Sequence, residues 1–197
     1  MRDQILKTVR TLAAFLPTLA LAQPVAAQRA GSWESSISGG AMYLDGALSS
    51  FLASFGFSDS GKTPSRLAPA AAVRLGYNVT DHWGFSIGTA GARASGVRYL
   101  TPFAAATYTA NLNAQFSPFL TGGTQFTRIT GNARVVHPTW GAHLGVGIRY
   151  MHDNKVALRL EGRMGIEHYA DLPGAKTAYT SIVTLGLSYF TAGRPAP

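Results

Sequence analysis

Apolar and polar residues alternate along most of the chain, and the alternation is clearest in residues 156–167. Every second residue from Val156 is apolar or glycine. The intervening positions include four charged residues: Arg159, Glu161, Arg163 and Glu167. A helix would scatter these residues around its circumference, so a period of two over this length predicts a β-strand with one face in an apolar medium. With the turn at 152–155, residues 140–169 are expected to form a long hairpin.

The same alternation recurs along the chain and predicts eight strands. They cover residues 33–44, 66–77, 83–94, 102–114, 117–128, 139–152, 155–169 and 178–190. Short turns at 78–82, 115–117 and 152–155 alternate with longer links at 45–65, 95–101, 129–138 and 170–177. This rhythm predicts an all-β fold, an eight-stranded up-and-down antiparallel barrel without exposed sheet edges. A bulge at Gly122-Gly123 would shift which residues face inward in the fifth strand.

Residues 1–27 differ from the rest of the chain and are expected to form a cleaved signal peptide. A basic start leads into an apolar run of 11 residues, 12–22, which is too short to span a bilayer as a helix. Small residues then offer cleavage after Ala22 or after Ala27, and we favour Ala27. Residues 28–32 would be a short lead-in, 33–190 the barrel, and 191–197 a C-terminal tail.

The composition narrows the class of protein. Of the 197 residues only 13% are charged, about half the share of soluble domains, and 22 are glycine. The formal charge of +8 comes from basic residues scattered singly, without the cluster that nucleic-acid binding requires. The absence of cysteine excludes disulfides, a lipidated N-terminal cysteine and thiolate metal sites. No other cluster of metal ligands and no phosphate-binding loop is present in the sequence, so we expect no cofactor.

The polar faces and the aromatic residues favour a transmembrane barrel over a soluble one. The polar faces are mostly Gly, Ala, Ser, Thr and Asn, which suit a narrow lumen better than a water-facing exterior. Aromatic residues fall near strand ends on the apolar face: Trp33, Tyr43, Tyr77, Trp83, Trp140, Tyr150, Tyr179 and Tyr189. The distance from Trp33 to Tyr43, about 33 Å along a strand, becomes about 25 Å when tilted, the height of an outer-membrane apolar band. These residues are therefore expected to form aromatic girdles.

The few charges on polar faces are expected to meet inside the barrel. The residues are Glu34, Arg74, Arg149, Arg159, Glu161, Arg163 and Glu167. A buried charge needs a partner, and opposite signs occur on several strands. We therefore predict an ion-pair network in the lumen, with Glu161 at its centre.

Residues 33–190 resemble the OmpA-like and OmpX-like eight-stranded outer-membrane barrels. The resemblance rests on the strand-turn-strand segment 75–83 and on the closing segment 185–190, which is similar to the C-terminal strand read by the barrel-insertion machinery. The chain departs from the family pattern because seven residues, 191–197, follow the last aromatic residue. The resemblance implies export to the cell outer membrane, with a lipopolysaccharide outer leaflet around the barrel. No peptidoglycan-binding domain is expected after the barrel, so the periplasmic anchoring of the longer family members is not implied.

Three functions fit such a barrel. The first is a non-enzymatic structural and surface scaffold, plugged by ion pairs, whose extracellular loops, chiefly 45–65, contact the outside. The second is a lipid-modifying enzyme similar to lipid A deacylases, with His137, His143 and His168 as candidate bases, although the His-x-Ser spacing of those enzymes is absent. The third is a narrow channel or transporter for a small apolar molecule, suggested by Phe51, Phe55 and Phe57. We favour the first and assign no catalytic residue.

Overall fold

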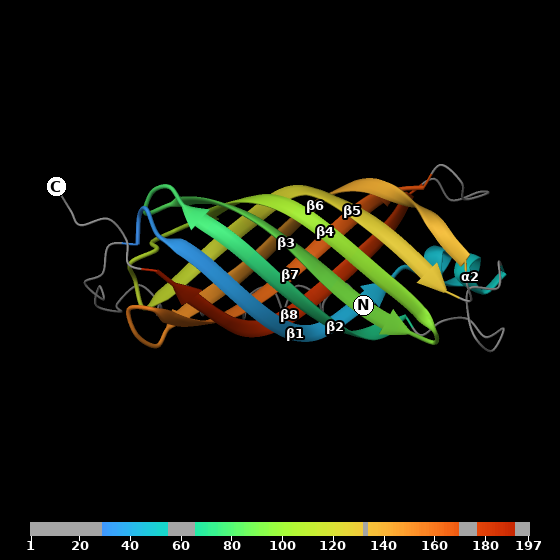
Figure 1. Ribbon diagram of the computed structural model, residues 1–197, viewed down its shortest axis with the longest axis horizontal. Coiled ribbons are helices and arrows are strands. Elements are labelled where there is room, and N and C mark those ends of the chain that lie inside the picture. Colours follow the sequence, from blue (N-terminus) through green and yellow to red (C-terminus); the bar gives the residue numbers. More distant parts are fainter. Residues whose placement is uncertain (1–28, 55–65, 132–133, 170–176, 192–197) are drawn as a thin grey trace, which may run out of the picture.

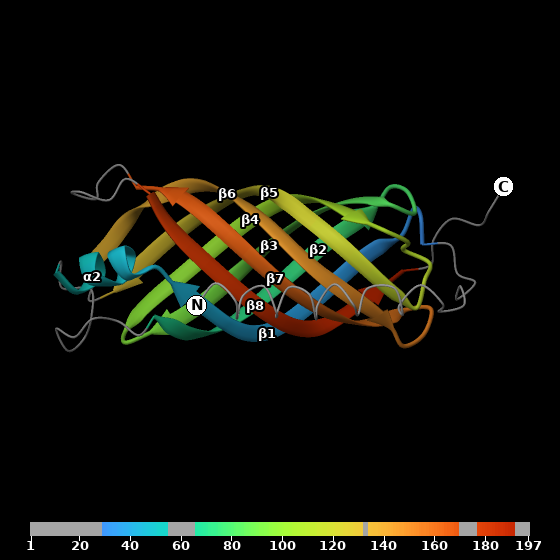
Figure 2. The ribbon, with the colours of Figure 1, turned by 180° about the vertical axis from the view of Figure 1, so that it is seen from behind.

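A closed barrel of eight antiparallel strands makes up the protein, as predicted (Figure 1). The computed structural model describes residues 29–54, 66–131, 134–169 and 177–191. The strands are β1 (Trp33–Leu44), β2 (Leu67–Asn78), β3 (Trp83–Ala94), β4 (Val97–Thr109), β5 (Phe116–Gly131), β6 (Arg134–Met151), β7 (Val156–His168) and β8 (Thr177–Phe190). Each strand pairs with its neighbours in sequence, and β8 pairs with β1 to complete the wall, as seen from behind in Figure 2. The predicted signal peptide lies outside the described residues.

The fourth strand begins earlier than the alternation predicts. It starts at Val97 and not at Pro102, and the link before it is only Ser95-Gly96. Both turn residues have positive φ, 49° at Ser95 and 82° at Gly96. Positive φ at both central residues matches the twist of a two-residue hairpin. The predicted longer link at 95–101 is therefore wrong, and β4 has its predicted length of 13 residues but lies at Val97–Thr109 and not at 102–114.

The strands of the β5–β6 hairpin are longer than predicted. Residues 129–138, predicted as a loop, are mostly strand, because β5 ends at Gly131 and β6 begins at Arg134. The register is continuous through Gly122-Gly123, so the bulge suspected there is absent. The irregularity lies instead between Thr127 and Ile129, where the pairing with β6 shifts by one residue. The face assignment of the strand around Gly122 is therefore the simple alternating one.

A short helix occupies part of the segment predicted as a long irregular loop. Helix α2 (Gly46–Ser54) follows β1 and carries Leu48 and Leu52, four residues apart on one face. Both side chains are buried, Leu52 completely, among apolar residues at that end of the lumen. No helix in the described part of the chain is long and apolar enough to cross a membrane.

The two faces of the wall differ in chemistry, as the alternation predicts. Large apolar residues such as Ile37, Leu144, Leu160 and Leu185 point outward and are exposed. The interleaved residues point into the lumen, which is filled with side chains. Near α2 the filling is apolar, and at the opposite end a smaller apolar cluster contains Leu112, Met151, Ala157 and Phe190.

The two ends of the barrel are built differently. Figure 1 shows α2 at one end, where the β3–β4 and β5–β6 hairpins also turn. The other end carries the connections 79–82, 110–115 and 152–155. There the segment Arg29–Ser32 joins the turns, because the Gly31 amide donates to the Asn78 carbonyl and the Asn78 amide to the Ser32 carbonyl. We call these the α2 end and the short-turn end.

Candidate functional site

Five of the seven predicted lumenal charges form one connected network. Glu34 pairs with Arg149 at 2.9 Å and with Arg159 at 3.2 Å. Glu161 pairs with Arg74 at 2.8 Å and with Arg159 at 3.0 Å. The side chains of these five residues are 2–9% exposed, so the network is buried in the lumen.

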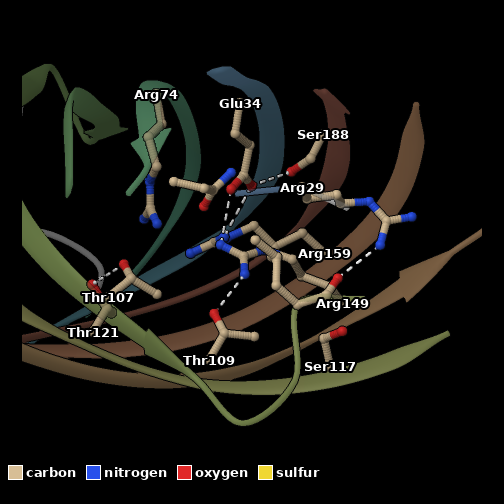
Figure 3. Close-up of polar contacts among 12 residues, drawn as sticks. Arg29, Glu34, Arg74, Thr107, Thr109, Ser117, Thr121, Arg149, Arg159 and Ser188 are labelled. Carbon is tan, nitrogen blue, oxygen red and sulfur yellow. Dashed lines mark hydrogen bonds and ion pairs between the residues drawn. The ribbon is translucent and has the colours of Figure 1, made fainter. Parts of the chain in front are cut away.

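Arg159 connects the two glutamates, so it and not Glu161 alone joins the halves of the network. Its Nε donates to Glu161 and its Nη1 to Glu34. Figure 3 shows Arg159 and Arg149 converging on Glu34, which also accepts a hydrogen bond from the Ser188 hydroxyl at 2.8 Å. Arg149 additionally donates to Thr109 at 2.9 Å. Side chains from five strands, β1, β4, β6, β7 and β8, thus fix the position of the Glu34 carboxylate and its partners.

Two phenylalanine rings support the arginines, and the sequence analysis did not single them out. The Phe119 ring lies 4.8 Å from the guanidinium carbon of Arg149 and 4.0 Å from that of Arg159. Arg74 and Arg163 lie over Phe103 at 5.2 and 4.2 Å. An aromatic face attracts a guanidinium electrostatically, and more strongly away from water. Both phenylalanines occupy inward positions of their strands, and this position was the only sign in the sequence that they could contact the lumenal charges.

Glycines make room for these rings. A Cβ at Gly147 would lie 2.3 Å from Phe119 Cζ and 2.4 Å from the Leu160 carbonyl oxygen. One at Gly88 would lie 2.6 Å from Phe103 Cζ and 2.5 Å from the Val73 carbonyl oxygen. Gly147 and Gly88 are the residues paired with Phe119 and Phe103 on the adjacent strands. The rings therefore occupy space that a side chain at these paired positions would fill.

The other two predicted charges stand apart from the ion pairs. Arg163 forms no ion pair within the described part of the chain, and its buried Nη1 has no hydrogen-bond partner there. Glu167 lies among neutral donors, because its Oε1 accepts from Gln125 and Thr127 and its Oε2 from Tyr169. Glu167 is 1% exposed and has no cation in contact among the described residues. The predicted network therefore does not extend to Glu167.

Arg29 closes the lumen at the short-turn end. Its Nη1 donates to the Leu112 carbonyl at 2.7 Å, and its backbone amide donates to Asn113 at 3.1 Å. The guanidinium lies 5.7 Å from the centre of the Phe190 ring and is attracted electrostatically by the Asp153 carboxylate. Burial lowers the pKa of Arg29, and the Asp153 carboxylate opposes that shift. The residue belongs to the lead-in segment, to which the sequence analysis gave no role.

The histidines considered as catalytic bases do not form a hydrolytic site among the described residues. His143 points into the lumen against Phe103, with ring centres 5.7 Å apart, and neither ring nitrogen has a partner there. His168 is exposed at the end of β7. The side chains of His137 and Phe51, and the residues Phe55 and Phe57, lie outside what the structure describes. The described residues hold no cluster of three or more His, Cys, Asp or Glu able to bind a metal ion.

The predicted girdle residues lie on the outer surface of the wall. Trp33 contacts Tyr77, with ring centres 5.1 Å apart. Tyr150 contacts Phe116 at 4.9 Å, and Trp140 contacts Phe126 at 5.0 Å, while Trp83 contacts Tyr108 at 5.2 Å. Tyr43, Tyr179 and Tyr189 are also exposed. Phe116, Phe126 and Tyr108 extend the set beyond the predicted residues.

Solved structures with this architecture are outer-membrane barrels. Neisserial surface protein A is 14% identical, with 81% of this chain and 97% of that chain covered and a TM-score of 0.61. The N-terminal barrel domain of Pseudomonas aeruginosa OprF is 13% identical, with 82% and 98% covered and a TM-score of 0.56. Ail of Yersinia pestis is 12% identical, with 82% and 99% covered and a TM-score of 0.52. At these identities the similarity shows the fold alone.

The sequence itself gives the family. None of the curated proteins matches this chain. Residues 13–190, however, match the family described as the outer membrane protein beta-barrel domain. This range contains every strand of the barrel, and the exposed apolar wall is the surface such a protein presents to the lipid bilayer. The chain belongs to the outer membrane protein beta-barrel domain family and is a small outer-membrane β-barrel protein.

Proposed function

We propose that the protein is a non-enzymatic structural and surface protein, whose barrel is a closed scaffold for the elements at its α2 end. The observation that carries this proposal is the filled lumen. A general pore needs a continuous aqueous path, whereas this barrel has eight strands, a number that side chains can fill.

Three layers of side chains support a closed lumen. Arg29 and the cluster around Phe190 lie at the short-turn end. The ion pairs of Glu34 and Glu161 follow, and Phe103 and Phe119 pack against their arginines. Towards α2 the filling is apolar and includes Leu48 and Leu52. An ion would have to displace the paired charges, pass the Glu167 carboxylate with its neutral donors, and then cross the apolar residues near α2.

The difference between the two ends supports a role for the α2 end outside the cell. In outer-membrane barrels the periplasmic connections are short and the extracellular ones longer. Residues 45–66, which include α2, and residues 169–176 are the long connections, and both lie at the same end. In this orientation β1 begins and β8 ends on the periplasmic side, which agrees with the predicted signal peptide at residues 1–27 and insertion by the barrel-insertion machinery. Two structural relatives are named a surface protein and an attachment invasion locus protein.

A liposome swelling assay with the purified protein tests the closed scaffold. We expect no swelling with small sugars, while a general porin reconstituted in parallel gives rapid swelling. Rapid sugar entry through this protein would overturn the proposal. Mass spectrometry of lipid A from cells with and without the protein tests the non-enzymatic part, for which we expect identical acylation.

A further inference from the structure

The lumenal network carries more positive than negative charge. Its three arginines, Arg74, Arg149 and Arg159, and the neighbouring Arg163, which forms no ion pair among the described residues, face two carboxylates, Glu34 and Glu161, so two positive charges are unbalanced. Glu167 is four residues from Arg163 along β7, roughly 13 Å away, and is occupied by neutral donors. The aromatic rings attract the arginines but carry no net charge. A buried excess charge is costly unless an ion of opposite sign compensates it.

The unbalanced charge borders a small cavity. The cavity has a volume of about 10 Å³ and is lined by three arginines, Arg74, Arg159 and Arg163, and three hydroxyl residues, Ser36, Ser38 and Thr184. Glu161 also lines it, but both its oxygens accept hydrogen bonds from Arg74, and Oε2 also accepts from Arg159. The volume is that of a site for one particle of about the size of a water molecule.

Unused donors belong to the arginines that line this cavity. The Nη1 atoms of Arg74 and Arg163 are buried and have no hydrogen-bond partner among the described residues. Arg163 as a whole is 7% exposed, and the Arg74 side chain is 9% exposed. Buried polar groups are normally satisfied, so unused N–H groups beside a cavity indicate a missing acceptor.

We propose that this cavity is a binding site for one small monovalent anion of the halide class, with chloride as the natural occupant. Arg74 and Arg163 donate to the anion, and the hydroxyl groups of Ser36 and Thr184 are the available O–H donors, since the Ser38 hydroxyl donates to the Ala72 carbonyl. The anion compensates one of the two unbalanced positive charges. A phosphate or carboxylate has several heavy atoms and is too large for a cavity of about 10 Å³, whereas chloride is a single atom only slightly larger than a water molecule. The site is independent of what the α2 end binds outside the cell.

Crystals of the barrel refolded and grown in sodium bromide test the proposal directly. We expect an anomalous difference peak in the cavity, within hydrogen-bonding distance of Arg74 and Arg163. Density for a water molecule without anomalous signal, or bromide peaks only on the outer surface, would overturn it.

A stability measurement gives an independent test in solution. The temperature at which the protein loses its folded gel mobility is compared in sodium chloride and sodium gluconate at equal ionic strength. Since a ligand that binds only the folded state stabilises it, we expect a saturable rise of several degrees in chloride. Arg163→Met should abolish the chloride dependence. Arg98→Met, which removes an exposed arginine at the β3–β4 hairpin, should retain it.

A second variant covers the case in which Arg163→Met does not fold. Thr184→Val keeps the side-chain shape and every charge but removes one hydroxyl donor, so we expect it to need a higher chloride concentration for the same stabilisation. A chloride effect equal in Arg163→Met and the wild type, or equal in Thr184→Val and the wild type, would contradict the site.

Discussion

Glu34 on β1 accepts a hydrogen bond from Arg149 on β6 at 2.9 Å, although the two residues are 115 positions apart in sequence. These strands are not neighbours in the wall, so the pair crosses the lumen. Arg159 on β7 approaches the same carboxylate. The network therefore connects parts of the wall that backbone hydrogen bonds do not join, and disruption of it should affect the stability of the whole barrel.

Glu161→Gln should strongly destabilise the barrel. The change leaves Arg74 and Arg159 without one carboxylate in a buried site, and loss of one partner of a buried pair costs about 3–5 kcal/mol. Urea unfolding in lipid vesicles measures the free energy of unfolding. Lys155→Gln, which removes an exposed charge in the β6–β7 turn, should change it by less than about 0.5 kcal/mol. Equal unfolding of the two variants would contradict the role of the network.

Leu160→Arg should impair insertion more than Ile166→Arg, although both residues lie on the outer face of β7. Leu160 is 46% exposed and pairs with Leu185, near the middle of the span from Tyr179 to Tyr189. Ile166 pairs with Tyr179, at one edge of that span. Arginine costs about 2–4 kcal/mol at the bilayer midplane and about 0–1 near the interfaces. The yield of the folded form on refolding into vesicles measures the difference, and equal yields would contradict the assigned depths.

Gly147→Ala should be destabilising, whereas Gly162→Ala should be nearly neutral. A Cβ at Gly147 collides with the Phe119 ring and with the Leu160 carbonyl oxygen, which belongs to the neighbouring strand and cannot move freely. Overpacking of this kind costs about 1–3 kcal/mol. A Cβ at Gly162 has no atom within 4 Å among those described. Urea unfolding of both variants checks the pair, and an unaffected Gly147→Ala would show that Phe119 does not need this space.

Asp153→Asn should lower stability at neutral pH but not in acid. Asp153 Oδ1 accepts hydrogen bonds from the Lys155 and Val156 amides, both at 2.7 Å, and these hold the pKa of the carboxyl below its ordinary value of 3.8. A depressed folded-state pKa gives stability that is present above the unfolded pKa and lost as pH falls through the folded one. The difference between wild type and variant in urea unfolding should therefore be constant above about pH 5 and vanish in strong acid. A difference that persists in acid would contradict this origin.

The period of two was enough to predict which residues line the lumen, because a strand puts neighbours on opposite faces regardless of its exact ends. Which charges pair was harder to predict. Arg159 reaches two glutamates, while Glu167 on the same face reaches none of the arginines. Such partners depend on the tilt and register of all eight strands, which alternation within one strand does not contain.

The start of β4 and the helix α2 were not predicted from the sequence, and in both cases the reason is a weak local pattern. Ser95-Gly96 is a dipeptide that can turn a hairpin in two residues, whereas the sequence analysis expected a longer link over residues 95–101. Leu48 and Leu52 have the i, i+4 spacing of a helix face, which is too short a pattern to stand out in a segment rich in serine and glycine. Phe103 and Phe119 lie on the inward face of their strands, but their contacts with arginine depend on how neighbouring strands are arranged, which the sequence pattern does not contain.

The seam between β1 and β8 gives the charge network a consequence for assembly. Among the described residues, the hydrogen-bond and ion-pair partners of the Glu34 side chain are Arg149, Arg159 and Ser188, which lie 115 or more residues later in the chain. A partly assembled barrel that lacks β6 to β8 therefore leaves this carboxylate without these partners, with only the electrostatic attraction of Arg74 on β2 near its open edge. The last strands supply that charge balance and the backbone partners of β1 in one step. Closure and neutralisation are thus coupled, which disfavours a barrel that stops short of eight strands.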